Sequence, residues 1–197
     1  MQPPSWAVED AVRLDLDGFG TEFSRAWSRL ESRFLKVEAW QSYRESADNE
    51  SQQAFERGDV KRAHELLRYE AEADRPLYED VQERGIDFAR IRIVQPPLTD
   101  YLRYEMVGYR IRSEMGESIE VVPASSERVL PDGDHFDFLL FDRDTALVHD
   151  YGRGPTGVQT GGWLVRESAV LRRLEARALE LRAKAEPLAR FLAAVRP

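Results

Sequence analysis

The sequence predicts an α+β fold, with a mixed or antiparallel sheet of about five strands, helices mainly on one face and a long C-terminal helix. Three observations lead to this prediction. The segments 34–40 and 87–94 alternate between the two faces of a strand. The segments around them repeat apolar residues every three or four positions, as helices do. Finally, residues 166–197 carry the most regular helical repeat of the chain.

The composition fits one acidic globular unit. The chain has 197 residues, of which 42% are hydrophobic, and this is enough to bury a core. Its 28 basic and 36 acidic residues give a net charge of −8, which disfavours nucleic acid as a partner because phosphate contacts depend on Lys and Arg. The absence of cysteine excludes disulfides, thiolate catalysis and Cys-ligated metals. Neither a signal peptide nor a membrane-spanning stretch is visible, so we expect a cytoplasmic protein without membrane contacts.

Three parts are expected along the chain. Residues 1–20 contain two early prolines and two late glycines, and we predict a flexible arm there. Residues 21–165 are predicted to form the α+β domain, and residues 166–197 a heptad-patterned helix that packs on this domain or on a partner. The domain begins with a helix whose apolar face contains Phe23, Ala26, Trp27 and Leu30.

Further helices are expected between the two strands. The polar segment 44–58 predicts a short helix, and 59–74 predicts a second one that ends where a proline interrupts the pattern. A third helix is expected at 76–84, because Gly85 follows it at the position that often ends a helix. These helices are expected to cover the sheet.

The middle of the chain carries the clearest helix start. Pro96 and Pro97 end the preceding strand, and Thr99 is a favourable N-cap residue. We therefore expect a capped helix that presses onto the sheet. The residues that span its inner face are Leu98, Tyr101, Leu102, Glu105, Met106 and Tyr109.

Four more strands are expected at 118–123, 136–142, 145–151 and 157–165, since Gly, Pro and Asp turns separate them. The pattern G-x-G-x-x-G over 152–157 precedes β-branched residues rather than a helix, so we interpret it as a hairpin connection and predict no dinucleotide cofactor. The sequence also lacks the spacing of calcium loops and of His-based zinc motifs. We therefore predict neither a metal nor any other cofactor.

The C-terminal segment carries an apolar seam with heptad spacing. Pro187 interrupts it, and we expect a kink or a break there. Two interpretations stay open: the seam pairs with a partner or a second copy of the chain, or it packs on the chain's own sheet or first helix. The leucines proposed for partner binding are Leu171, Leu174, Leu181 and Leu188.

Charged and aromatic residues are expected to meet where the strand 87–94 and the helix 99–109 come together. Arg90 and Arg92 lie on one face of the strand and need water or acids beside them. They favour either an anion site flanked by tyrosines or an internal network of ion pairs, because acidic residues are equally near. The residues proposed for ligand binding are Arg92, Asp100, Tyr101, Arg103, Tyr104 and Glu105.

The order of several motifs resembles a known family. The motifs are RGIDFARIRIVQPPLTDYLRYEM, GESIEVVP, FDFLLFD and ALVHDY. They resemble an uncharacterised actinobacterial domain family in which a segment like RVRVVSEPLTDYLRYEL precedes strands like GEDIRYL, DFWLFD and MHYD. The resemblance covers about residues 30–151. Members of this family are often encoded beside helix-turn-helix regulators, which implies a regulatory or accessory role and no catalytic residue.

Two functions follow as hypotheses. The first is a non-catalytic regulatory or adaptor protein that acts through protein–protein contacts, as a dimer or as an accessory to a transcriptional regulator. The second is a small-molecule enzyme or ligand sensor with a pocket between the sheet and the 99–109 helix. No assembled catalytic motif is present in the sequence, and this favours the first hypothesis.

Overall fold

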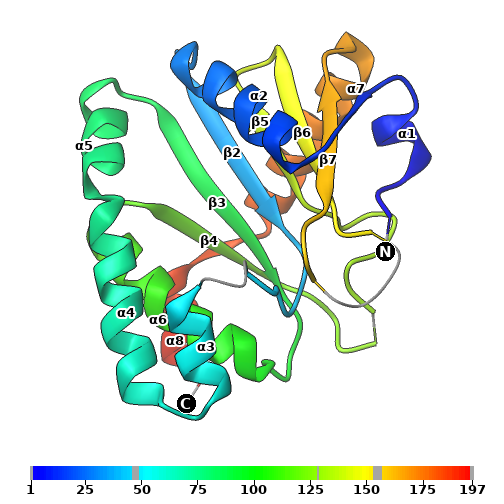
Figure 1. The fold of residues 1–197 in the computed structure, drawn as a ribbon. Helices are drawn as coiled ribbons and strands as arrows, with labels where there is room; N and C mark the ends of the chain where they lie inside the picture. The colour runs from blue at the N-terminus through cyan, green and yellow to red at the C-terminus, as the bar shows by residue number, and fades with distance from the viewer. Residues whose placement is uncertain (1, 46–48, 128, 153–156, 196–197) are drawn as a thin grey trace.

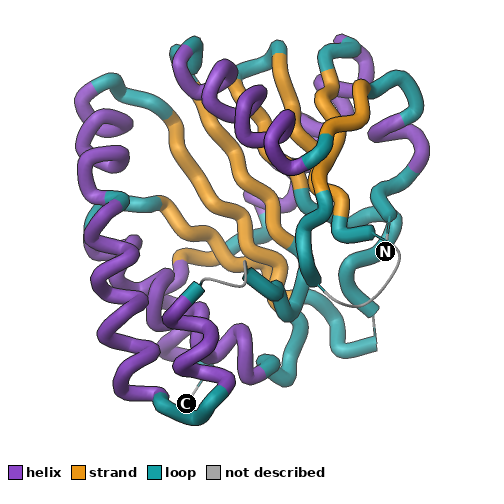
Figure 2. Tube along the Cα trace, in the orientation of Figure 1, coloured by secondary structure: helices purple, strands orange, loops and turns teal. Residues whose placement is uncertain are grey.

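The computed structural model describes residues 2–45, 49–127, 129–152 and 157–195. Within them, a single sheet of eight strands lies between two layers of helices (Figure 1). The mixture of helices with a mixed sheet is therefore confirmed, but the prediction of about five strands is wrong. The prediction of helices mainly on one face is also wrong, because helices cover both faces of the sheet, as Figure 2 shows.

The sheet has the strand order β1-β7-β6-β5-β2-β3-β4-β8. The neighbours β2, β3 and β4 run parallel, and the other neighbouring pairs are antiparallel. The edge strands β1 and β8 contain three and two residues, which is too short for a visible alternation, and the sequence pattern therefore missed them. The strands are β1 (Val12–Leu14), β2 (Arg33–Glu38), β3 (Asp87–Val94), β4 (Ser118–Pro123), β5 (Phe138–Phe141), β6 (Thr145–Asp150), β7 (Gly161–Val165) and β8 (Glu186–Pro187).

Most of the long helices begin at a side chain that accepts a backbone N–H group. The predicted cap Thr99 is confirmed, since its Oγ1 accepts a hydrogen bond from the N–H of Leu102 at 3.1 Å. Gly85 has a φ of +65° directly after a helix, as predicted. The helices are α1 (Ser5–Val8), α2 (Leu16–Ser28), α3 (Glu50–Glu56), α4 (Val60–Ala73), α5 (Arg75–Glu83), α6 (Asp100–Glu114), α7 (Ser168–Ala183) and α8 (Leu188–Ala194). None of the helices in the described ranges is long and apolar enough to cross a membrane.

The N-terminal segment is not the flexible arm that the sequence predicted. Ala7 of α1 is 1% exposed and belongs to the core, and β1 pairs with β7. The helix α2 begins at Leu16 because the Asp15 carboxylate accepts a hydrogen bond from the N–H of Gly18 at 2.8 Å. The glycines that suggested a flexible end lie inside this helix, where each costs only about 1 kcal/mol.

The C-terminal seam packs on the chain's own sheet. Leu171, Leu174 and Leu181 are buried in one cluster with side chains of β2, β3, β5, β6 and β7. The predicted break is confirmed, since α7 ends before Lys184 and α8 begins after Pro187. Leu188 is buried in a separate cluster with α6 and β4. The interpretation of these four leucines as a partner-binding surface is therefore wrong, because the sheet and α6 already cover them.

The glycine pattern is described only in part. Residues 153–156, and with them the middle of the predicted hairpin connection, lie outside the described residues. Gly152 and Gly157 have positive φ angles, and the strand β7 follows from Gly161. No helix follows the pattern, as the sequence indicated.

The two faces of the sheet differ in polarity. The face covered by α1 and α7 is apolar throughout its cluster. The opposite face is apolar and rich in aromatic side chains under α2, but it carries charged side chains of β2 and β3 near α6. Because charged groups inside a fold are costly unless they are paired, this part of the sheet contains the candidate site.

Candidate functional site

Two parallel strands supply the charged floor of the site. In the register of β2 and β3, Lys36 lies beside Arg90 and Glu38 beside Arg92. Successive side chains of a strand point to opposite faces, so these four residues share the face that α6 covers. The arginines predicted to need acids therefore have an acid on the neighbouring strand.

Glu38 is the centre of a buried ion-pair network. Its two oxygens accept hydrogen bonds from Arg90 Nη1 at 3.0 Å, and its Oε1 lies 2.8 Å from Lys36 Nζ. Tyr109 of α6 donates its hydroxyl to the same carboxylate at 3.2 Å, and Arg90 Nε donates to Glu117 at 2.6 Å. Burial raises the pKa of Glu38, but the charges of Arg90 and Lys36 outweigh it and hold the pKa well below its ordinary value.

Arg92 has a structural position beneath the site. Its side chain is fully buried and donates hydrogen bonds to the carbonyl oxygens of Glu38 and Ile93, both at 3.1 Å, and to that of Trp40. Its guanidinium also lies 5.4 Å from the ring centroid of Tyr43. Arg92 thus holds the end of β2 and supports the site, but it does not line the cavity described next.

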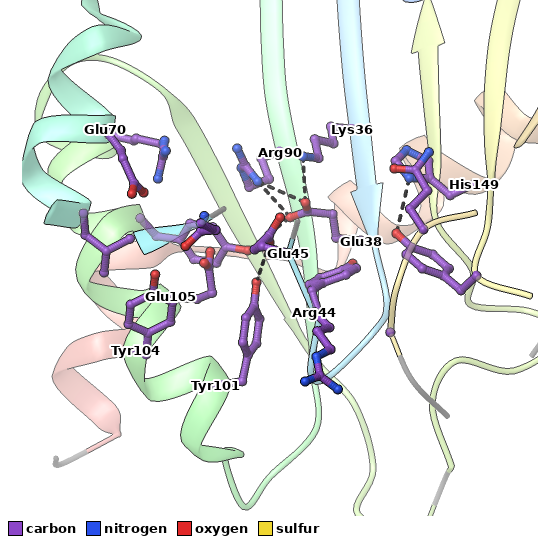
Figure 3. Close-up of a pocket in the computed structure, with 18 residues that line it drawn as sticks. Lys36, Glu38, Arg44, Glu45, Glu70, Arg90, Tyr101, Tyr104, Glu105 and His149 are labelled. Carbon is purple, nitrogen blue, oxygen red and sulfur yellow. Dashed lines mark hydrogen bonds and ion pairs between the residues drawn. The ribbon is translucent and has the colours of Figure 1, made fainter. Parts of the chain in front are cut away.

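A cavity of about 290 Å³ lies between this floor and α6, and we call it the α6 cavity (Figure 3). Its walls come from β2, β3, the segment before α3, the helices α4 and α6, and the end of β6 with the segment after it. The lining residues are Lys36, Glu38, Tyr43, Arg44, Glu45, Asn49, Leu67, Glu70, Arg90, Tyr101, Tyr104, Glu105, Tyr109, Arg112, His149, Tyr151, Gly157 and Gln159. The cavity lies where the sequence placed a pocket, between the sheet and the 99–109 helix.

The helix α6 divides the predicted ligand-binding residues between two sides. Tyr101, Tyr104 and Glu105 line the α6 cavity, because spacings of three and four residues place them on one helical face. Asp100 and Arg103 pair with each other at 2.8 Å on the outer side, where their side chains are 86% and 58% exposed. These two residues therefore do not line the α6 cavity, and Arg103 lines a separate cavity next to α8. Their role in ligand binding stays a prediction.

Glu105 is the acidic residue of the cavity whose carboxylate has no hydrogen-bond or ion-pair partner among the described residues. Within the described residues its carboxylate makes no hydrogen bond or ion pair, whereas Glu45 accepts a hydrogen bond from the Tyr101 hydroxyl at 3.2 Å. Burial raises the pKa of Glu105, and the neighbouring charges of Glu45 and Glu38 raise it further, against the opposing charges of Arg90 and Arg112. Figure 3 shows Glu105 and Glu45 on the same side of the cavity.

A second polar cluster, centred on Asp137, holds two of the tyrosines that line the cavity. Asp137 accepts hydrogen bonds from the backbone N–H of Ala39 at 2.7 Å, from the Tyr151 hydroxyl at 2.7 Å and from the Tyr43 hydroxyl. Burial raises the pKa of Asp137, although these hydrogen bonds oppose the shift. The cluster orients the rings of Tyr43 and Tyr151 that line the cavity.

His149 is expected to stay neutral between pH 5 and 8. Burial and the nearby charge of Lys36, opposed by the charge of Glu38, lower the pKa of its imidazole to about 3. The ring packs edge-on against Phe19 with centroids 4.9 Å apart. A ¹H–¹⁵N NMR titration of the imidazole in the folded protein should show no midpoint in this range, whereas the protein in concentrated urea should titrate near pH ~6.5. A midpoint between pH 5 and 8 in the folded protein would contradict the lowered pKa of this half-buried side chain.

Several cavity residues were missed by reasoning from the sequence. Lys36 and Glu38 carried a signal, since two charged residues alternate within the apolar strand 34–40. Glu45 and Gln159 lie in connecting segments, where no periodic pattern points to a cavity. The arrangement offers carboxylates, guanidinium groups and tyrosine hydroxyls for hydrogen bonds and ion pairs with a ligand. Among the described residues, no group of three or more Asp, Glu or His side chains has the arrangement of a metal site.

The comparisons with known proteins identify the family of the chain. No curated protein matches it. Among solved structures, the archaeal chromatin protein TrmBL2, whose structure is described as showing a novel mode of DNA binding, matches with a TM-score of 0.43 and 10% identity. The match covers 90% of this chain, which spans about half (52%) of the TrmBL2 chain, and a similarity this low carries no argument about function.

A family described as "Domain of unknown function (DUF6879)" matches residues 21–193. The match is wider than the segment 30–151 on which the resemblance was based, and it includes α7 and most of α8. An uncharacterised domain family was therefore the right expectation, while its actinobacterial origin and its link to regulators stay predictions. Because the match covers most of the sequence, the chain belongs to the DUF6879 family.

Proposed function

We propose that the protein binds a small polar molecule in the α6 cavity and acts as a ligand sensor. The observation that carries this proposal is Glu105, which lines the α6 cavity and whose carboxylate makes no hydrogen bond or ion pair with any described residue. A site that served packing alone would bury apolar side chains here, because crowded charges cost free energy. Groups with shifted pKa values in a cavity are typical of functional sites.

The regulatory or adaptor role stays a prediction, as do dimer formation, a protein partner, a cytoplasmic location and the exclusion of nucleic acid. The sensor proposal gives the regulatory role a physical basis. The walls of the α6 cavity belong to segments that are far apart in the sequence. A ligand that contacts α4 and α6 together would favour the conformation in which these two helices lie close around it. In this proposal, ligand binding changes the outer surface of α4 and α6, and a partner protein such as a regulator binds to that surface.

The proposal is tested by filling the cavity. Gln159 lines the α6 cavity, whereas its neighbour Val158 is 37% exposed and does not line it. We expect small polar ligands found in a thermal-shift screen to bind Gln159→Trp at least ~10-fold more weakly than the wild type, since a large ring occupies their space. Val158→Trp adds the same ring outside the cavity and should bind like the wild type.

The same screen can also contradict the proposal that the α6 cavity binds a ligand. Ligands that bind all three proteins equally, as measured by isothermal titration calorimetry, would place their site elsewhere. A broad screen of small acids, bases, sugars and nucleosides that stabilises none of the proteins would also contradict the sensor role.

A further inference from the structure

Three basic side chains that line the α6 cavity, those of Lys36, Arg90 and Arg112, are already paired with acids. Arg90 contacts Glu38 and Glu117, and Lys36 contacts Glu38 as well. Arg112 Nε lies 3.0 Å from Asp74. Because these charges are satisfied inside the protein, a negatively charged ligand finds little free positive charge on the floor of the cavity.

The acidic side chains of the cavity are satisfied less completely. Glu105 has no hydrogen bond or ion pair in the described part of the chain, Glu45 accepts a hydrogen bond from the Tyr101 hydroxyl, and Glu70 accepts one from the Ser51 hydroxyl at 3.0 Å. Hydroxyl groups do not neutralise a carboxylate. The remaining cation of the lining is Arg44, which is exposed and whose guanidinium lies well apart from Glu105 in Figure 3.

Aromatic rings stand beside these carboxylates. The rings of Tyr101 and Tyr104 lie 6.0 Å apart at an angle of 59°, and those of Tyr43 and Tyr101 lie 5.8 Å apart at 67°. The face of a tyrosine ring attracts a cation electrostatically, and a site that combines such rings with a carboxylate suits ammonium and guanidinium groups.

We infer that the ligand of the α6 cavity is an organic cation whose ammonium or guanidinium group lies between Glu105 and Glu45, next to the rings of Tyr101 and Tyr104. This inference rests on the proposed function and specifies its ligand class. The group donates hydrogen bonds to both carboxylates and relieves their mutual repulsion. The nearby charges of Glu38, Arg90 and Arg112 are engaged with one another or with acids outside the cavity.

The inference is tested with probes of different charge on the full chain. Agmatine and putrescine serve as cations, succinate as an anion and xylitol as a neutral molecule. We expect the cations alone to stabilise the wild type, and Glu105→Gln to weaken their binding about tenfold or more, because hydrogen bonds to charged groups are the strong ones. Glu79→Gln removes an exposed carboxylate of α5 and should leave binding unchanged.

The pH dependence separates a direct role of Glu105 from a structural one. Cation affinity should fall as the pH is lowered through the raised pKa of Glu105, and this part of the pH dependence should be absent in Glu105→Gln. The variant should fold, because it removes a carboxylate that Glu45 and Glu38 disfavour, and its unfolding at pH 8 should occur at the same temperature as that of the wild type or higher.

Two results would overturn the inference. Failure of both cations to bind the wild type at millimolar concentration is one, and cation binding that Glu105→Gln leaves unchanged is the other. If succinate or xylitol binds instead, and Gln159→Trp weakens that binding, the ligand class is wrong and the proposed function stands. If Gln159→Trp leaves every bound probe unaffected, the proposed function fails together with the inference.

Discussion

Replacing Leu174 by alanine is expected to lower the free energy of unfolding by about 2–5 kcal/mol, which is the range for a leucine truncated inside a packed core. Leu174 is 0% exposed on α7 and belongs to the apolar cluster between this helix and the sheet. The methyl groups that are lost leave a void, because neighbours such as Ala178 are too small to fill it. Urea unfolding followed by circular dichroism measures the change, and an unchanged m-value is expected.

The same helix offers a matched control. Leu179 is 39% exposed, and its truncation to alanine should change the free energy of unfolding by less than about 0.5 kcal/mol. Equal effects of Leu174→Ala and Leu179→Ala would mean that α7 does not pack on the sheet in solution. In that case, unfolding should also depend on protein concentration, because a seam that pairs between chains is stabilised by mass action.

The sequence predicted elements that local signals determine. The strand β3 was expected at 87–94 and is found there, because its alternation is complete within the strand. Thr99 caps α6 as predicted, since a cap needs only the backbone N–H groups of the next turn. By contrast, β8 exists only through its pairing with Val121 and Glu120 of β4, and no local pattern contains that contact.

The candidate site was predicted in part for a similar reason. The pattern placed Tyr101, Tyr104 and Glu105 near the sheet, and the phase of α6 brings them to the cavity. The same motif contains Asp100 and Arg103. The sequence alone does not show that these two residues lie on the outer side of α6, because it does not show which side of the helix faces the sheet. The distinction depends on which side of α6 meets the sheet, and that depends on packing between segments far apart in the sequence.

The largest electrostatic effect is expected at Glu38. Glu38→Gln should lower the free energy of unfolding by about 3 kcal/mol at pH 7, because it leaves the half-buried Lys36 without a carboxylate and leaves Arg90 with Glu117 alone. The glutamine amide can accept a hydrogen bond, but it carries no negative charge to balance the positive charges of Arg90 and Lys36. Glu79→Gln is the control and should change the free energy by less than about 0.5 kcal/mol.

The pH dependence of this difference identifies its origin. The folded-state pKa of Glu38 lies well below its ordinary value of 4.5, so the carboxylate contributes its full stability above that value and loses it as the pH falls through the folded-state pKa. The gap between wild type and Glu38→Gln in urea unfolding should therefore narrow in acid. If the difference in unfolding free energy between wild type and Glu38→Gln stays constant down to pH ~3, the lost stability comes from altered packing and not from the lost charge. The ion-pair network would then not be what holds the floor of the α6 cavity in place.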